Sequence, residues 1–197
     1  MIKLSDVTLI GLTGRDTDAE TMSALAIQMQ KEIVFGAVKV IWDGQIKTID
    51  DWNYKICFDL WKYFDTTHCF LFHPDGYIIH PELWNDEWLK LDYIGSPWPL
   101  PQDDYSYRDI YGKIQRVGNS VGLRSRKLLK LPTELNLEFK PFYGNTNEDG
   151  KLCVEWRTIL EQHGCKFATF EQALKFGKEH DLPENKDLKT FCYHSPF

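Results

Sequence analysis

Short apolar runs alternate with amphipathic segments in the first part of the chain, and this alternation most constrains the possible fold. The runs at 7–13, 36–42 and 68–73 are rich in β-branched and aromatic residues, as buried strands are. Apolar residues at helical spacing fill the two intervals, after a capping box at Thr17–Glu20 and from about Asp50. Strands separated by helices with short joins imply βαβ units. The pattern predicts a three-layer α/β/α sandwich with a mostly parallel central sheet.

The rest of the chain continues the same class without a break. A strand or turn at 117–125 leads into a helix near Arg126, and further helices are expected over 148–164 and from Thr169 to about Lys178. The stretch 99–115 is longer than an ordinary loop, and long ordered loops tend to be functional. No repeat, linker or low-complexity tract divides the 197 residues. We therefore expect a single domain over 1–197.

Charge and cysteine content exclude several classes of function. Lys plus Arg is 23 and Asp plus Glu is 29, a formal net charge of −6, which argues against general binding to nucleic acid or to anionic membranes. No apolar run approaches the ~20 residues that span a bilayer. The five cysteines form no CxxC pair, and no signal peptide is recognisable at the start. We expect buried thiols, a reducing compartment and a cytoplasmic location.

Three segments that pair a small residue with a polar one follow the predicted strands. They are Thr13–Arg15, Asp43–Gly44 and Asp75–Gly76. In a parallel sheet ligands bind beyond the carboxyl ends of the strands, and glycine lets the backbone approach a ligand closely. Each glycine alone is explained as well by a simple turn. The familiar GxGxxG, P-loop, GxSxG and HExxH motifs do not occur.

Three acidic residues, one alone and two adjacent, are candidates for chemistry. Asp75 leaves the end of an apolar strand, where a carboxylate is either a solvated turn residue or a ligand for a hard cation such as Mg²⁺ or Mn²⁺. His194 could add a nitrogen ligand, although a lone histidine there is more often a surface residue. Glu148 and Asp149 open a predicted helix, where the helix dipole alone favours acidic residues and where a general base is the functional alternative.

The order of these motifs resembles a family. DYIGSPW at 92–98 and VGNSVGLRS at 117–125 are the most specific pieces, and Asp75–Gly76, Glu148–Asp149 and Phe191–His194 complete the pattern. Together they resemble a group of GT-A-type glycosyltransferase domains from polysaccharide-synthesis loci and large viruses, over about residues 5–195. The chain departs from that family at two points: Gly118-Asn119-Ser120-Val121 stands where the family has GNGG, and His73-Pro74-Asp75 stands where many members have Asp-x-Asp.

The resemblance implies a GT-A-like fold and a metal-assisted, inverting transfer of a sugar from a nucleotide-diphosphate sugar, with UDP-sugars favoured, to a glycan or other hydroxyl acceptor. A retaining outcome is compatible with the same residues. The implied cofactor is Mn²⁺ or Mg²⁺. The implied donor-site residues are Thr13, Gly14, Arg15, Asp43 and Gly76; the acceptor or sugar site comprises Trp98, Gly118 and Asn119; Asp75 and His194 bind the cation; and Asp149, with Glu148 beside it, is the base.

Two further expectations concern the base and the alternatives. The helix start is expected to keep the pKa of Asp149 low, with its carboxylate in the same cleft as Asp75. The altered GNGG and the single aspartate at 73–75 also fit a non-catalytic sugar- or nucleotide-binding module on the same fold. A nucleotidyltransferase is the third reading, but it normally needs a basic glycine-rich loop, whereas Arg15 is the only base in 14–19.

Overall fold

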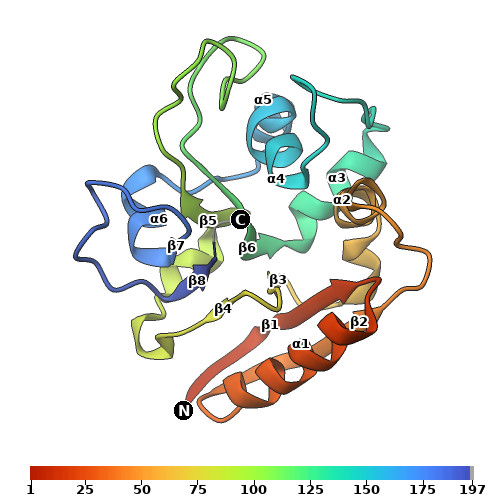
Figure 1. The fold of residues 1–197 in the computed structure, drawn as a ribbon, viewed down its shortest axis with the longest axis vertical. Helices are drawn as coiled ribbons and strands as arrows, with labels where there is room; N and C mark the ends of the chain where they lie inside the picture. Colours follow the sequence, from red (N-terminus) through yellow and green to blue (C-terminus); the bar gives the residue numbers. More distant parts are fainter. Residues whose placement is uncertain (196–197) are drawn as a thin grey trace.

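Five strands form the central sheet of the molecule, in the order β2–β1–β3–β6–β5. A computed structural model describes residues 1–195 (Figure 1). The strands of this sheet are β1 (Ile2–Thr13), β2 (Ile33–Trp42), β3 (His68–Leu71), β5 (Tyr93–Pro97) and β6 (Val117–Ser125). Strand β1 pairs in parallel with both β2 and β3, so the first three predicted strands share one sheet, as expected.

The sheet is mixed rather than mostly parallel, which corrects the sequence prediction. Strand β6 runs antiparallel to both β3 and β5. The chain enters β6 from β5 through the long loop 98–116 and not through a crossover helix. Neighbours joined by a plain loop pair antiparallel, whereas a parallel pair requires the crossover. The α/β class of the prediction is confirmed, and the parallel character is limited to the first three strands.

A second, smaller sheet covers one end of the central sheet. It consists of β4 (Gly76–Ile78), β8 (Cys192–His194) and β7 (Gly177–Lys178), in that order. Strand β4 follows directly after β3, and β8 lies near the end of the described chain. The antiparallel register pairs Gly76 with His194 and thereby brings two segments far apart in the sequence into contact.

Helices pack against both faces of the central sheet. They are α1 (Asp16–Met29), α2 (Ile49–Phe58), α3 (Arg126–Glu134), α4 (Glu148–Gly150), α5 (Arg157–Gln162) and α6 (Phe170–Phe176). Buried residues of α1 and α6 share one apolar cluster with Leu9 and Phe70, and those of α2, α3 and α5 share another with Ile10 and Leu71. Neighbouring strand residues therefore point into opposite layers, as period-two alternation requires.

The helix starts were predicted with mixed success. Thr48 caps α2, and Thr169 forms the expected capping box of α6 with Gln172. Helix α1 begins before the predicted box at Thr17: its N-cap is Arg15, whose side chain makes no capping bond. The predicted helix over 148–164 is present but interrupted, because a π-helical turn at Lys151–Glu155 separates α4 from α5. Such turns occur often at functional sites.

Two further expectations concern the cysteines and membrane-spanning helices. All five cysteines are buried free thiols, as predicted. None of the helices within residues 1–195 combines the length and apolar character needed to cross a bilayer.

Candidate functional site

A cleft of about 750 Å³ opens where β1, β3 and β5 end. Its walls come from the turns after these strands, from the loop before α2, from the loop 98–116 and from the segment around α4. This volume is within the range of about 300–1,000 Å³ that small-molecule sites occupy. The cleft lies beyond the carboxyl ends of the parallel strands, where the α/β topology favours ligand binding.

Thr13, Gly14 and Arg15 line this cleft, as predicted for residues near a ligand. A Cβ on Gly14 would lie 2.1 Å from the carbonyl oxygen of Ile46, so only glycine lets the loop after β2 close over the end of β1. That loop adds Lys47 to the cleft wall. Within residues 1–195 neither Arg15 nor Lys47 pairs with a carboxylate, so both cations remain available to an anionic ligand.

Two predicted donor-site residues support the cleft from outside. The Asp43 carboxylate forms an ion pair with Lys55 at 2.7 Å and accepts the Gln45 amide, and this pairing lowers its pKa. Gly76 lies against the ring of His194, which a Cβ would approach to 2.7 Å. Neither residue is among those that line the cleft in the described chain. Asp43 shapes the loop that carries Lys47, and Gly76 makes room for His194.

Asp149 faces the cleft, and among residues 1–195 its carboxylate accepts hydrogen bonds from backbone amides. Its Oδ1 accepts the Gly150 N–H at 2.7 Å, and its Oδ2 accepts the Asn119 N–H at 3.1 Å. Burial, with the charges of Glu148 and Glu179, raises the pKa of Asp149 from 3.8 to about 7. The expected low pKa is therefore wrong: α4 has only three residues, and burial among carboxylates outweighs the dipole of so short a helix. A carboxyl group titrating near 7 suits proton transfer at neutral pH.

Glu148, the residue before Asp149, forms a buried ion pair. Its side chain is 1% exposed and lies 2.6 Å from Nη2 of Arg124, which is 0% exposed. The second oxygen accepts the Asp149 amide and the Ser120 hydroxyl. Burial raises the pKa of Glu148, and Arg124 offsets part of that effect. The arrangement makes Glu148 a support for Asp149, since its own oxygens are occupied by protein donors.

Asn119 connects several parts of the site. It has φ +91°, a left-handed conformation that asparagine tolerates better than most residues. It belongs to a bulge of β6, where the register against β5 shifts between Ile94 and Ser96. Its amide reaches Asp149, its side-chain oxygen lies 2.9 Å from Nδ1 of His194, and its carbonyl accepts a bond from Arg124. Asn119 is fully buried, so it supports the cleft and does not face a ligand.

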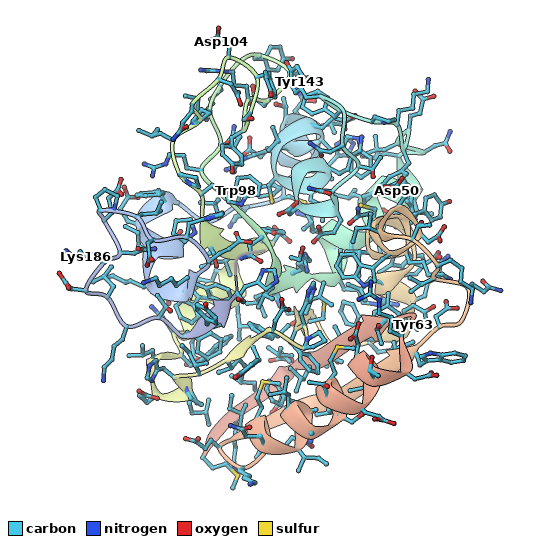
Figure 2. All side chains as sticks on the ribbon, viewed as in Figure 1. Asp50, Tyr63, Trp98, Asp104, Tyr143 and Lys186 are labelled. Carbon is cyan, nitrogen blue, oxygen red and sulfur yellow. The ribbon has the colours of Figure 1, made fainter. Side chains whose placement is uncertain are left out.

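Trp98 lines the cleft and lies directly against Gly118. The indole stacks on Tyr107 with ring centroids 4.8 Å apart. Figure 2 shows Trp98 at the root of the loop 98–116, with Asp104 at the tip and Tyr143 at the same end of the molecule. Of the three residues predicted for the acceptor side, Trp98 is therefore the one at the cleft surface.

Replacing Gly118 with alanine should displace this tryptophan. The new Cβ would meet the Trp98 ring at 1.8 Å, so we expect an overpacking cost of about 1–3 kcal/mol in the free energy of unfolding. Urea denaturation measures it. Gly150→Ala is the matched control, because a Cβ there has no neighbour closer than 3.6 Å. Equal stability of the two variants would contradict the packing described here.

A mixed cluster of possible metal ligands lies beside the cleft. His73, Asp75 and His194 each offer a ligand atom within 4.8 Å of one another. His73 and His194 also line the cleft, whereas Asp75 does not, so the expectation that Asp75 shares the cleft with Asp149 is wrong: Asp75 lies next to His73 and His194, outside the cleft lining. Burial, with His194 and Arg124, lowers the pKa of His73 to about 3. For His194, burial acts to lower the pKa, but carboxylates, Glu179 foremost, outweigh it and raise the value.

Glu179 and His73 are the residues that sequence reasoning missed. Glu179 follows β7, lines the cleft and lies 3.4 Å from Nδ1 of His194. No motif marks it, and only the pairing of β7 with β8 brings it to His194. His73 carried a usable signal, because it occupies the position of the first aspartate in the Asp-x-Asp pattern.

Exposed aromatic side chains border the mouth of the cleft. Tyr105, from the loop 98–116, lies with its ring centroid 5.8 Å from that of Tyr143, and Phe142 contacts Tyr143 at 4.4 Å. Tyr105 and Tyr143 line the cleft although each is more than half exposed. Exposed aromatic faces next to polar groups suit ligands with both apolar and hydroxyl-bearing surfaces.

Fold and cleft together define a single-domain α/β protein with a mixed sheet and a polar cleft at its strand ends. The chain belongs to the family of proteins of unknown function DUF5672, whose profile matches residues 44–194. The matched region contains His73, Asp75, Asp149 and His194, and it begins after β1 and α1. Comparison with curated proteins and with solved structures gave no match.

Proposed function

We propose that this chain is a GT-A-like glycosyltransferase that moves a sugar from a nucleotide-diphosphate sugar to a carbohydrate hydroxyl. The observation that carries the proposal is the placement of Asp149, whose carboxyl group titrates near 7, in a cleft that His73 and His194 of the possible cation site also line. Arg15 and Lys47, which also line the cleft, suit a diphosphate. Tyr105 and Tyr143 at the mouth suit the face of a sugar ring.

The proposed reaction needs one proton acceptor and one means of stabilising a leaving group. The Asp149 carboxylate takes the proton of the acceptor hydroxyl, whose oxygen bonds to the anomeric carbon. The bond between that carbon and the diphosphate oxygen breaks, and the nucleoside diphosphate leaves with the electron pair. Attack from the face opposite the leaving group inverts the anomeric centre.

The residues beside the cleft fit a divalent cation. Nε2 of His73 is buried without a hydrogen-bond partner in the described structure, next to the carboxylate of Asp75 and the ring of His194. When bound, a divalent cation neutralises the charge that develops on a departing diphosphate. Asp75 and His194 would hold it, and Asn119 and Glu179 orient His194. Two imidazole rings favour Mn²⁺ over Mg²⁺ among the cations considered.

The direct test is donor binding followed by transfer. A thermal-shift screen of nucleoside diphosphates and nucleotide sugars, with and without Mn²⁺, should give a hit, because a ligand at about 100 times its Kd stabilises the folded state by about 2.7 kcal/mol. Hits are then tested for hydrolysis and for transfer to simple glycosides. Binding without turnover would indicate a non-catalytic module, and release of a sugar 1-phosphate from the nucleotide sugar would indicate a nucleotidyltransferase. Either result contradicts the proposal.

Asp75→Asn should abolish the effect of the cation on nucleotide binding while the fold is kept. The Asp75 side chain is 45% exposed, so the free energy of unfolding should change by less than about 0.5 kcal/mol. Calorimetric titration of the nucleoside diphosphate, with and without Mn²⁺, measures the effect. Asp86→Asn, at the exposed start of the 3₁₀ helix Asp86–Lys90, is the control. A variant that binds with unchanged dependence on Mn²⁺ would remove Asp75 from the site.

A further inference from the structure

The cluster of His73, Asp75 and His194 has the spacing of ligands around one ion. The distance from Nε2 of His194 to Oδ1 of Asp75 is 3.7 Å, too long for a hydrogen bond. Two atoms that each lie about 2.1 Å from a common ion are separated by roughly 3.0–3.5 Å at octahedral or tetrahedral angles. The third ligand atom lies within 4.8 Å of both. Because Asp75 is half exposed, a small movement of its side chain closes the remaining gap.

Backbone pairing assembles this cluster. Strands β4 and β8 are antiparallel neighbours, with Gly76 opposite His194. An isolated bridge between His73 and Gly76 turns the chain tightly after β3. The Ser195 amide donates to the backbone oxygen of Asp75 at 3.0 Å. Main-chain hydrogen bonds between these segments therefore hold the backbone of the three residues close together.

The two histidines are oriented from behind. Nδ1 of His194 lies 2.9 Å from Oδ1 of Asn119 and 3.4 Å from Glu179, which directs its Nε2 toward Asp75. Histidines that bind metals typically donate their other ring N–H to a carboxylate or carbonyl in this way. The His73 ring contacts the Trp52 ring edge to face, with centroids 5.1 Å apart, and its Nε2 is buried without a hydrogen-bond partner among the described residues. A buried nitrogen without a partner costs free energy unless a ligand uses it.

We propose that His73, Asp75 and His194 form a three-ligand site for a divalent transition-metal ion, and that His73 makes the site discriminate against Mg²⁺. The inference deepens the proposed function, because this is the cation that the proposed transfer would use. Imidazole ligands suit Mn²⁺, Fe²⁺, Co²⁺ and Zn²⁺, whereas Mg²⁺ strongly prefers oxygen ligands and retains water. A set with two nitrogens and one oxygen therefore differs in kind from a site built of two aspartates.

The test titrates the metal-free full chain with MnCl₂, ZnCl₂ or MgCl₂ in a calorimeter, with no nucleotide present. We expect one Mn²⁺ or Zn²⁺ per chain and at least about 100-fold weaker binding of Mg²⁺. His73→Ala should weaken Mn²⁺ binding by at least about tenfold. His163→Ala, which removes the exposed histidine at the C-cap of α5 outside the cluster, should leave the affinity unchanged. Mg²⁺ binding within tenfold of Mn²⁺, or an unaffected His73→Ala, would overturn the proposal.

A spectroscopic measurement on the unmodified chain covers the case in which His73→Ala does not fold. Electron spin echo modulation of bound Mn²⁺ detects coordinated imidazole nitrogen directly. Two coordinated imidazoles are expected, and one or none contradicts the assignment of His73. Because no nucleotide sugar is used, the outcome is independent of the transfer assay. A metal site without transfer would refute only the proposed function, and transfer without a metal site only this inference.

Discussion

Asp149→Asn is expected to lose glycosyl transfer by about 10²–10⁴-fold while donor affinity remains nearly unchanged. Asparagine has the shape of aspartate, and its single side-chain oxygen can still accept one of the two amide N–H groups, from Asn119 or Gly150, that the carboxylate accepts. It cannot accept the proton of the acceptor hydroxyl. Steady-state kinetics with a saturating donor separate the two effects, since kcat should fall and donor binding should persist. Loss of donor binding instead would place Asp149 in the donor site and remove it as the base.

The pH profile gives an independent check of the same residue. The wild-type rate should rise through a pKa of about 7 as Asp149 loses its proton, because only the carboxylate can act as the base. Burial raises this pKa most, the charges of Glu148 and Glu179 raise it further, and the Gly150 amide and Arg124 lower it. Glu148→Gln should therefore shift the rising limb to lower pH without abolishing transfer. Glu87→Gln, at an exposed position, is the control and should leave the profile unchanged.

Asp149→Asn should also make the protein more stable. The pKa of Asp149 is higher in the folded chain than the usual 3.8, so the folded state binds more protons than the unfolded state between about pH 4 and 7. Stability from this group is present below pH 4 and is lost as pH rises through about 7. Asp149→Asn avoids the loss and should raise the free energy of unfolding above pH 7 by roughly 1–4 kcal/mol. Denaturant titrations at pH 5 and 8 test the sign.

The second large effect is expected at the buried ion pair. Arg124→Met leaves the Glu148 carboxylate 1% exposed without its cation, which should cost about 3–5 kcal/mol in the free energy of unfolding at pH 7. The cost should shrink at pH 5, where the unpaired carboxyl group takes up a proton. The double variant Arg124→Met/Glu148→Gln should lose less than Arg124→Met alone, because no buried charge remains.

An exposed ion pair provides the control for this prediction. Lys90 and Glu87 lie 2.6 Å apart, and both side chains are more than 60% exposed. Lys90→Met should cost less than about 1 kcal/mol because water screens the pair. If Arg124→Met costs no more than Lys90→Met, the Arg124–Glu148 pair does not contribute as described.

The sequence predicted the elements whose signals are local. The apolar runs near 7–13, 36–42 and 68–73 fix three strands of one sheet, and Thr169 with Gln172 caps α6 as expected. The antiparallel direction of β6 could not be predicted from local patterns. It depends on the long loop 98–116, after which β6 pairs with β3. Local patterns determine strands, whereas pairing is decided by contacts between distant segments.

The chemistry of the site depended still more on distant contacts. The pKa of Asp149 is raised by burial and by the charges of Glu148 and Glu179. Glu179 follows β7, a strand that no sequence motif predicts. Arg124 lies inside an apolar strand pattern, where nothing marks it as the partner of Glu148. The helix-dipole argument for a low pKa failed because it considered only the neighbours along the chain.

Asn119, in the bulge of β6, contacts both Asp149 and His194, through different groups. Its amide contacts Asp149 through the backbone, and its side chain contacts His194. Glycine at this position would retain the backbone conformation and lose the side-chain contacts with His194 and the Val121 amide, whereas alanine would strain the backbone contact as well. Coupling between sites is reciprocal at equilibrium. If a ligand that draws His194 toward Asp75 changes the proton affinity of Asp149, deprotonation of Asp149 must change the affinity for that ligand by the same factor.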